Sequence, residues 1–203
     1  MSQRRDTLVI FDDAATLARY GSVRPVTDDI ATVHGMDETQ RNLLLDRLDD
    51  THRDTLHPLL MTVSLERRPV YEPYDEITQV YFPIDVVFSY VSLMEQGQTS
   101  EVATVGCEGA LGATLLLDGQ HMPFRSEVQI PGRALVMRAD DFAGCVAEDP
   151  EFRLFVQRYL MSFIVELGQG VACSSLHRVD RRLARWLLLS HDRAQRDHFG
   201  ITH

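Results

Sequence analysis

Residues 80–112 read VYFPIDVVFSYVSLMEQGQTSEVATVGCEGALG. A run of β-branched and aromatic residues covers 86–94, the polar stretch 96–98 interrupts it, and residues 101–105 resume the pattern. Two runs of this kind around a short glycine-containing break are typical of a β-hairpin. The stretch therefore predicts two antiparallel strands at the centre of the fold.

Three glycines follow this hairpin at intervals of three residues, at Gly106, Gly109 and Gly112. Glycine accepts positive φ angles and has no Cβ, so its backbone can approach another group closely. The spacing predicts a loop that can bind a ligand or another chain.

Short strand signals separated by turn residues continue on both sides of the hairpin. The predicted strands are 63–65, 70–72, 79–82, 86–94, 101–105, 126–130 and 134–138. In 126–130 apolar and polar residues alternate, as in a strand with one wet face. Regularly spaced short strands indicate an antiparallel sandwich or barrel.

Helical signals precede the strands. Residues 37–48 offer Asp37 as an N-cap and then clustered leucines, which predicts a short amphipathic helix. A second helical turn is expected over 50–56. Residues 1–35 show no sustained period, so we expect a poorly ordered extension there.

Helices also follow the strands, beginning with a short one predicted at 140–145. Asp149 and Pro150 then provide an N-cap and a first helical residue for a long helix. Its apolar positions recur with helical spacing over about five turns; they are Phe152, Phe155, Val156, Tyr159, Leu160, Phe163, Ile164, Leu167 and Val171. A break is predicted at 173–175, before a final arginine-rich helix.

The apolar stripe of the long helix is wider than one side of a small β-roll easily covers. We expect part of it to be a dimer seam between two near-parallel helices. The residues predicted for this seam are Phe155, Tyr159, Phe163 and Leu167. The alternative, that the helix packs wholly within one monomer, stays open.

Composition narrows the function classes. The chain has 203 residues, 44% of them hydrophobic, and a formal net charge of −10. This charge argues against a surface that binds nucleic acid over its whole extent. The sequence has no run of about 18 apolar residues and no secretory signal pattern, so we expect no membrane association and a cytoplasmic location.

Metal and catalytic signatures are weak. Cys107, Cys145 and Cys173 are isolated, so neither a disulfide framework nor a structural zinc site is expected. A cupin-type metal enzyme also has strands of this kind, but the histidines here are scattered singly and lack the H-x-H spacing of its ligands. No hydrolase, metalloprotease or P-loop motif occurs, so no enzymatic activity is predicted.

Six segments in order resemble the Crp/Fnr family of bacterial transcriptional regulators, over residue 37 to the end. They are NLLLDRL at Asn42, VSLERRPVYEP at Val63, VYFP at Val80, EVATVGCEG at Glu101, PGRALVMRADDF at Pro131 and VDRRLARWLLL at Val179. The resemblance implies an α+β protein: an antiparallel β-roll of the cyclic nucleotide-binding type with N-terminal short helices and a long C-terminal dimerisation helix.

This resemblance also implies a domain plan. It comprises an extension (1–35), a β-roll sensor domain (36–148), a dimerisation helix (149–173) and the start of a DNA-binding region (176–203). The family's winged helix-turn-helix would begin about where residues 199–203 stand. We therefore expect a homodimer that binds DNA only if the full gene product carries that reader; a truncated sequence and a natural short form are both open.

The family's cyclic-nucleotide pocket uses a G-E-L loop and a later arginine that pairs with the phosphate. The corresponding loop here is Gly109, Ala110, Leu111 and Gly112. Ala110 occupies the acidic position, and the arginine position falls near Met122 or Pro123. Arg125 fills the role only if the register shifts. We list these residues as the candidate ligand site and expect an effector other than cyclic AMP.

Other sensing chemistry of the family lacks its residues here. An iron–sulfur sensor needs clustered cysteines, and His121 and Cys107 are candidates for haem ligation by position alone. No cofactor is predicted, and the effector is unknown. The second hypothesis is a stand-alone sensor or interaction module without DNA binding; an in-frame reader domain after His203 would favour the regulator over that module.

Overall fold

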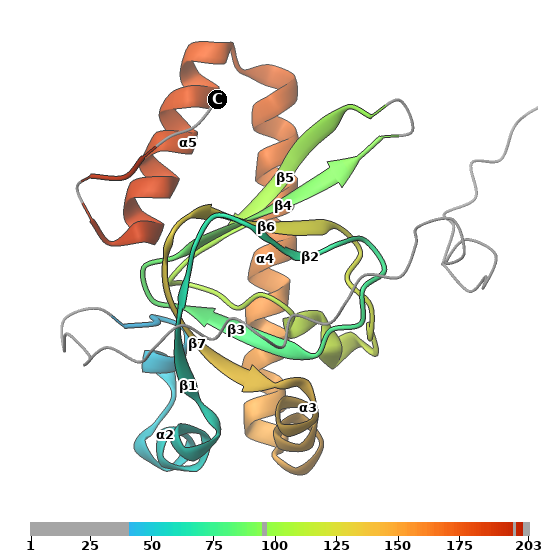
Figure 1. The fold of residues 1–203 in the computed structure, drawn as a ribbon, viewed down its shortest axis with the longest axis vertical. Coiled ribbons are helices and arrows are strands. Elements are labelled where there is room, and N and C mark those ends of the chain that lie inside the picture. The colour runs from blue at the N-terminus through green and yellow to red at the C-terminus, as the bar shows by residue number, and fades with distance from the viewer. Residues whose placement is uncertain (1–40, 95–96, 197, 201–203) are drawn as a thin grey trace, which may run out of the picture.

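A computed structural model describes residues 41–94, 97–196 and 198–200 (Figure 1). The predicted extension at 1–35 lies outside these residues. The elements in chain order are η1 (Leu45–Arg47), α2 (Asp50–Leu56), η2 (His57–Leu59), β1 (Met61–Leu65), β2 (Pro69–Tyr71), β3 (Gln79–Pro83), β4 (Val87–Leu93), β5 (Thr99–Val105), η3 (Ala113–Leu117), β6 (Arg125–Ile130), β7 (Gly132–Arg138), α3 (Ala139–Glu148), α4 (Pro150–Leu176) and α5 (Val179–Ala194).

The strands form two antiparallel sheets, ordered β1-β7-β3 and β2-β6-β4-β5. The hairpin β4-β5 pairs Phe88 with Val105 and Leu93 with Thr99, and a register shift follows Tyr90. All seven predicted strands are present, and β6 buries Ser126, Val128 and Ile130 as its alternation predicted. The predicted β-roll followed by a long helix is confirmed.

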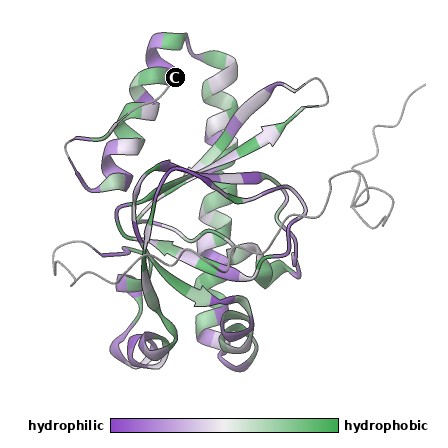
Figure 2. Cartoon of the chain, in the orientation of Figure 1, coloured by the Kyte–Doolittle hydropathy of each residue, from purple (hydrophilic) through white to green (hydrophobic). Residues whose placement is uncertain are grey.

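Aromatic side chains fill the interior of the roll. Tyr81 meets Phe88 with ring centroids 5.7 Å apart, and Tyr90 contacts both Phe124 at 6.2 Å and Phe163 at 5.8 Å. Edge-to-face and tilted pairs at these distances stabilise a core beyond the area that they bury. In Figure 2 the strands of the roll carry both hydrophobic and hydrophilic residues, and α5 does so too. The interior of the roll is thus packed by the protein's own side chains.

The long helix α4 begins as predicted. The Asp149 carboxylate accepts hydrogen bonds from the backbone N–H groups of Glu151 and Phe152, at 2.9 and 3.0 Å, and Pro150 is the first helical residue. The helix then runs beside both sheets for the length of the roll and beyond it, and α5 returns along its far half (Figure 1).

The predicted break at 173–175 is wrong, because α4 continues to Leu176. The Ser174 and Ser175 hydroxyls donate to the Val171 carbonyl at 2.9 Å, a bond that serine makes inside a helix without ending it. The chain turns instead at His177 and Arg178, whose backbones are extended.

The predicted helix over 37–48 is also wrong in its described part, where only the 3₁₀ turn η1 forms. Asn42 is buried, and its side chain accepts from Leu45 N–H at 2.9 Å and donates to the carbonyls of Pro83 and Gly109. These bonds hold the segment to the roll as a tight turn. Residues 37–40 lie outside the described part, and α2 matches its prediction.

α4 is long and apolar enough, by length and composition alone, to cross a membrane. A single helix of this kind is weak evidence for a span, since core helices of soluble proteins share these properties. One side of α4 buries Phe152, Val156 and Leu160 against the roll. We therefore describe it as a helix of the folded domain.

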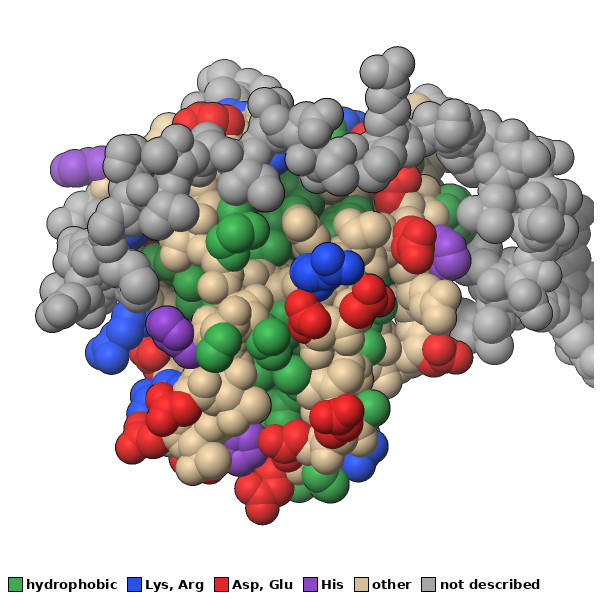
Figure 3. Space-filling model, turned by 60° about the horizontal axis from the view of Figure 1, so that its bottom comes forward, with side chains coloured by type: hydrophobic (Ala, Val, Ile, Leu, Met, Phe, Trp, Pro, Cys, Tyr) green, Lys and Arg blue, Asp and Glu red, His purple; other side chains and the backbone are tan. Residues whose placement is uncertain are grey.

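His52 bridges the N-termini of α2 and α4. Its Nδ1 lies 2.8 Å from the Asp49 carboxylate and its Nε2 3.1 Å from that of Asp149. Figure 3 shows acidic side chains gathered on this face of the molecule. The hydrogen bond that its ring donates to the Asp49 carboxylate raises the pKa of His52, and hydrogen bonds from the backbone and ring of His52 lower the pKa of Asp49.

This bridge makes stability depend on pH. A raised histidine pKa contributes stability below the unfolded value of 6.5 and loses it as pH rises through the folded value. The lowered pKa of Asp49 contributes above 3.8 and is lost as pH falls through the folded value. We expect thermal unfolding of His52→Gln to differ most from the native protein between pH 3.8 and 6.5.

The exposed His57 offers a matched control for this measurement. His57→Gln should track the native protein across the same range. A His52→Gln difference that is constant from pH 5 to 9 would contradict the ion-pair account, since the pairing needs a protonated ring.

Candidate functional site

Each of the three glycines after β5 receives another segment of the same chain. A Cβ at Gly106 would collide with the side chain of Arg193 on α5, and one at Gly109 would lie 2.6 Å from the Tyr159 hydroxyl oxygen on α4. Gly112 has a φ of +91° and packs against the carbonyl of Gln79 on β3. The close backbone approach predicted from the glycine spacing is present, and it serves contacts within the chain.

Tyr159 covers the predicted binding loop. Its hydroxyl accepts from Ala110 N–H at 3.0 Å and donates to the Ala110 carbonyl at 3.1 Å. Ala110 is 4% exposed, and Leu111 is fully buried where its backbone pairs with Tyr81. Burial raises the pKa of Tyr159, so the hydroxyl stays neutral and keeps both bonds. Loop 109–112 is therefore sealed against α4.

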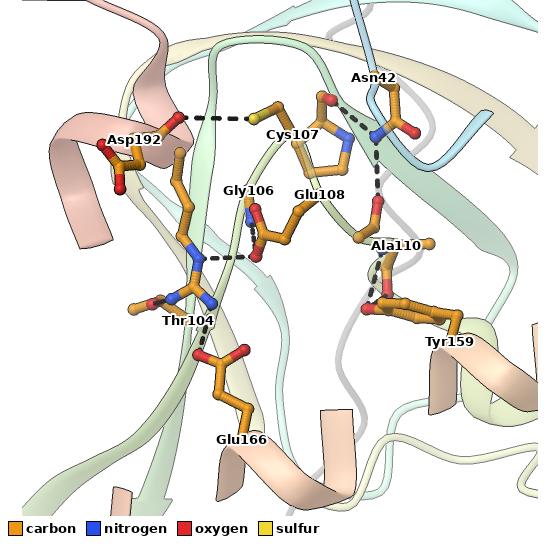
Figure 4. A network of polar contacts seen from close by, with 12 residues as sticks. Asn42, Thr104, Gly106, Cys107, Glu108, Ala110, Tyr159, Glu166 and Asp192 are labelled. Carbon is orange, nitrogen blue, oxygen red and sulfur yellow. Dashed lines mark hydrogen bonds and ion pairs between the residues drawn. The ribbon is translucent and has the colours of Figure 1, made fainter. Parts of the chain in front are cut away.

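The buried side chain of Arg193 lies at the centre of a charge network beside this loop, and Figure 4 labels its partners Thr104, Glu108 and Glu166. Its Nε donates to the Glu108 carboxylate at 2.6 Å, one terminal nitrogen donates to Glu166 on α4 at 2.5 Å, and the other donates to Thr104 on β5. The Arg193 side chain is 5% exposed. Burial alone would lower its pKa, but the two carboxylates outweigh that effect and raise it. The guanidinium is thus a permanent charge held by three elements.

The neighbouring residues strengthen the same junction. The Glu108 carboxylate also accepts from Gly106 N–H at 3.3 Å, and the Cys107 thiol donates to the Asp192 carbonyl at 3.6 Å. Burial, with the Glu108 charge, raises the pKa of Cys107 to about 11. A thiol with this pKa stays protonated near neutral pH, which disfavours redox sensing at Cys107.

A groove of about 730 Å³ lies between β5, the far half of α4 and α5. Trp186 of α5 crosses it, with its indole N–H donating to Glu101 on β5 at 3.0 Å. Burial raises the pKa of Glu101, although hydrogen bonds from Ser89, Trp186 and Gln129 oppose this. Arg193 and Glu166 are among the residues that line this groove.

Comparisons with known proteins bear on the fold. No protein-family model matches the sequence, and no curated protein is significantly similar to it. Among solved structures, CLP, the c-di-GMP responsive global regulator of Xanthomonas campestris, matches with a TM-score of 0.56 at 12% identity, covering 68% of this chain and 70% of that one. A CooA variant from Carboxydothermus hydrogenoformans matches with a TM-score of 0.52 at 17% identity, covering 76% and 99%. The catabolite activator protein of Thermus thermophilus matches with a TM-score of 0.50 at 14% identity, covering 64% and 60%.

The fold is the cyclic nucleotide-binding fold of these regulators.

Arg125, the remaining residue of the predicted ligand site, already forms ion pairs within the chain. Arg125 Nε lies 3.4 Å from Glu72 and 3.5 Å from Glu127. Met122, near the expected arginine position, is fully buried. His121 is exposed and forms a β-bridge with Glu76. The structure thus brings Gly109, Ala110, Leu111 and Gly112 together, whereas Arg125 pairs with Glu72 and Glu127. Ligand binding by these residues stays a prediction.

Three of the four predicted seam residues lie on the side of α4 that faces the roll. Phe155, Tyr159, Phe163 and Leu167 are each half-buried. Phe155 and Tyr159 pack with the hydrophobic cluster that contains Phe152, Val156 and Leu160, Phe163 packs with the roll's interior, and Leu167 lines the groove beside α5. Much of the aromatic stripe is therefore used within the monomer.

Sequence reasoning missed the three charged residues of the junction. Glu108 is the single charged residue between Gly106 and Gly109, and Glu166 is the single charged residue in the apolar stretch 159–176. An isolated charge in an apolar helix indicates a buried partner, and that signal was available. The identity of the partner could not be predicted from the sequence, because Arg193 lies 85 positions from Glu108.

Proposed function

We propose that the chain is the effector-sensing and dimerisation part of a Crp/Fnr-like DNA-binding transcriptional regulator in the bacterial cytoplasm. At 12–17% identity the matching structures establish only the fold. Their names suggest the regulatory role that we propose. The observation that carries the proposal is a second apolar stripe on α4, on the side away from the roll.

This outward stripe consists of exposed apolar residues at helical spacing. Its members and their exposed fractions are Leu154 45%, Met161 60%, Ile164 54% and Val165 53%. Leu154 and Met161 are seven residues apart, and Ile164 follows Met161 by three, as at the a and d positions of a coiled coil. An exposed apolar stripe of this kind marks an interaction surface. We propose that α4 of a second copy of the chain covers it.

Sedimentation tests this proposal directly. We expect the protein at micromolar concentration to sediment as a dimer, with the two α4 helices paired through the outward stripe. A monomer at every accessible concentration would overturn the dimerisation role and leave the stand-alone module as the better reading.

Cyclic AMP and cyclic GMP are not the proposed effectors. The interior of the roll holds the aromatic cluster around Tyr90, Tyr159 covers Ala110, and Arg125 is paired with glutamates. Charge-assisted bonds to the phosphate and ribose each contribute roughly 1.5–3 kcal/mol in a site that has them. We expect titration calorimetry to detect no binding of either nucleotide at micromolar concentration. Micromolar affinity for either would contradict this part of the proposal.

A further inference from the structure

Helix α5 is attached to the rest of the protein mainly at its C-terminal end. Its buried residues are Ser190, Arg193 and Ala194. Toward its start, Val179 is 74% exposed and Leu183 54% exposed, and the chain enters it through the extended pair at 177–178. A helix held at one end and hinged at the other is easily released.

The attachment continues just beyond the helix. The Gln195 side chain donates to the Ile84 carbonyl at 2.7 Å, and Arg196 donates to the Asp85 carbonyl at 2.8 Å. These bonds reach backbone oxygens of the β3-β4 connection, whose position does not depend on α4. Arg193 is different, because its two carboxylates belong to the glycine loop and to α4.

We infer that Arg193 is a positioning residue that couples the glycine loop and α4 to the placement of α5. The inference rests on the proposed function, since α5 leads to the place where a DNA reader follows in regulators of this kind. Glu108 moves with the loop and Glu166 moves with α4, and both bind Arg193. A shift of either carboxylate therefore changes how firmly α5 is held.

The chemistry of the junction makes this coupling steep. A guanidinium satisfies two carboxylates only when both lie in the plane and reach of its fork, so a relative shift of the loop and α4 breaks one pair. The guanidinium is buried whereas both carboxylates are partly exposed, so breaking a pair leaves the buried charge of Arg193 less compensated. Gly106 is required for the approach, because any side chain there would meet Arg193. A small movement at the sensor loop or the dimer helix is thereby converted into release of α5.

The single tryptophan of the chain reports the state of α5. Trp186 is half-buried against Glu101 when α5 is docked. Hydrogen exchange followed by mass spectrometry would measure α5 separately from the roll, and Trp186 fluorescence would give a second readout. The variants are Arg193→Gln, Arg193→Lys, Glu108→Gln and Glu166→Gln. Arg185→Gln is the control, because among the described residues no carboxylate pairs with Arg185.

We expect α5 amides to exchange roughly tenfold to a hundredfold faster in Arg193→Gln, because the variant loses two ion pairs whose arginine is buried and whose carboxylates are partly exposed. Exchange in β4, β6 and β7 should stay unchanged, and Trp186 emission should shift to longer wavelength. Glu108→Gln and Glu166→Gln should loosen α5 although neither lies on it. Arg193→Lys, which keeps the charge but loses the fork, should give an intermediate rate.

The coupling fails if both Arg193 variants leave α5 exchange at the native rate, or if the glutamine variants loosen only their own elements. If Arg193→Gln does not fold, the lysine variant decides the question by the same measurement. Because α5 exchange is read in monomer and dimer alike, its failure would leave the sedimentation test of the proposed function intact.

Discussion

Met161→Glu combined with Val165→Glu is expected to dissociate the dimer, weakening association at least a hundredfold, on the order seen for substitutions at interface hot spots. Both side chains are more than half exposed on the outward stripe, so glutamate costs little in the monomer. In a parallel helix pair each stripe faces its own copy. Four carboxylates would then meet in an apolar seam. Sedimentation of native and variant proteins across a concentration series measures the effect.

Ser162→Glu is the matched control. Ser162 is exposed and adjacent to Met161, but it lies about 100° around the helix from it. This variant should remain a dimer. The comparison also separates the two faces of α4, since Phe163 packs against Tyr90 and Phe163→Glu should destabilise the roll itself. Dimers that survive Met161→Glu with Val165→Glu but dissociate in a folded Phe163→Glu variant would restore the inward seam.

Ala110→Glu is expected to destabilise the protein by at least about 3 kcal/mol, because it places an unpaired carboxylate in a buried site. This substitution puts the acidic residue of a nucleotide-binding loop back at its expected position. Ala110 is 4% exposed, and both its backbone polar groups are bonded to Tyr159. The new carboxylate would have to displace Tyr159 or unfold the loop. Chemical denaturation followed by circular dichroism measures the loss.

Gln120→Glu adds the same charge at an exposed position on the connection that follows this loop. It should unfold within a few tenths of a kcal/mol of the native protein, as surface substitutions usually do. An Ala110→Glu protein of native stability that binds cyclic AMP would show that the loop is open, and would contradict the covering role of Tyr159.

The local features of the fold were predictable from the sequence. Alternation in β6, the glycine-containing break between β4 and β5, and the Asp149–Pro150 start of α4 act over a few residues, and each was confirmed. The two errors have different causes. The helix expected over 37–48 yields to the bonds of Asn42 with Pro83 and Gly109, and these partners lie 41 and 67 positions away. The break expected at 173–175 rested on composition, whereas the serines there bond back to their own helix.

At the candidate site the close approach of the glycine backbone was predictable, but the groups that approach it were not. The glycine spacing correctly indicated close backbone approach after β5, but the approaching groups, Tyr159 and Arg193, belong to helices 49 and 85 or more positions away. Which side of α4 faces the roll was equally undetermined, because apolar residues occur on both sides. Accordingly the predicted seam residue Phe163 faces Tyr90.

For this protein, strands, caps and the long helix follow from the sequence because hydrophobic periodicity and capping act through neighbours along the chain. Only tertiary structure decided which groups approach the glycine loop, how Tyr159 covers Ala110, and that Arg193 pairs with Glu108 and Glu166. Such contacts depend on which side chains, far apart in sequence, the folded roll brings within hydrogen-bonding distance. A pattern that extends over a few neighbouring residues does not contain that information.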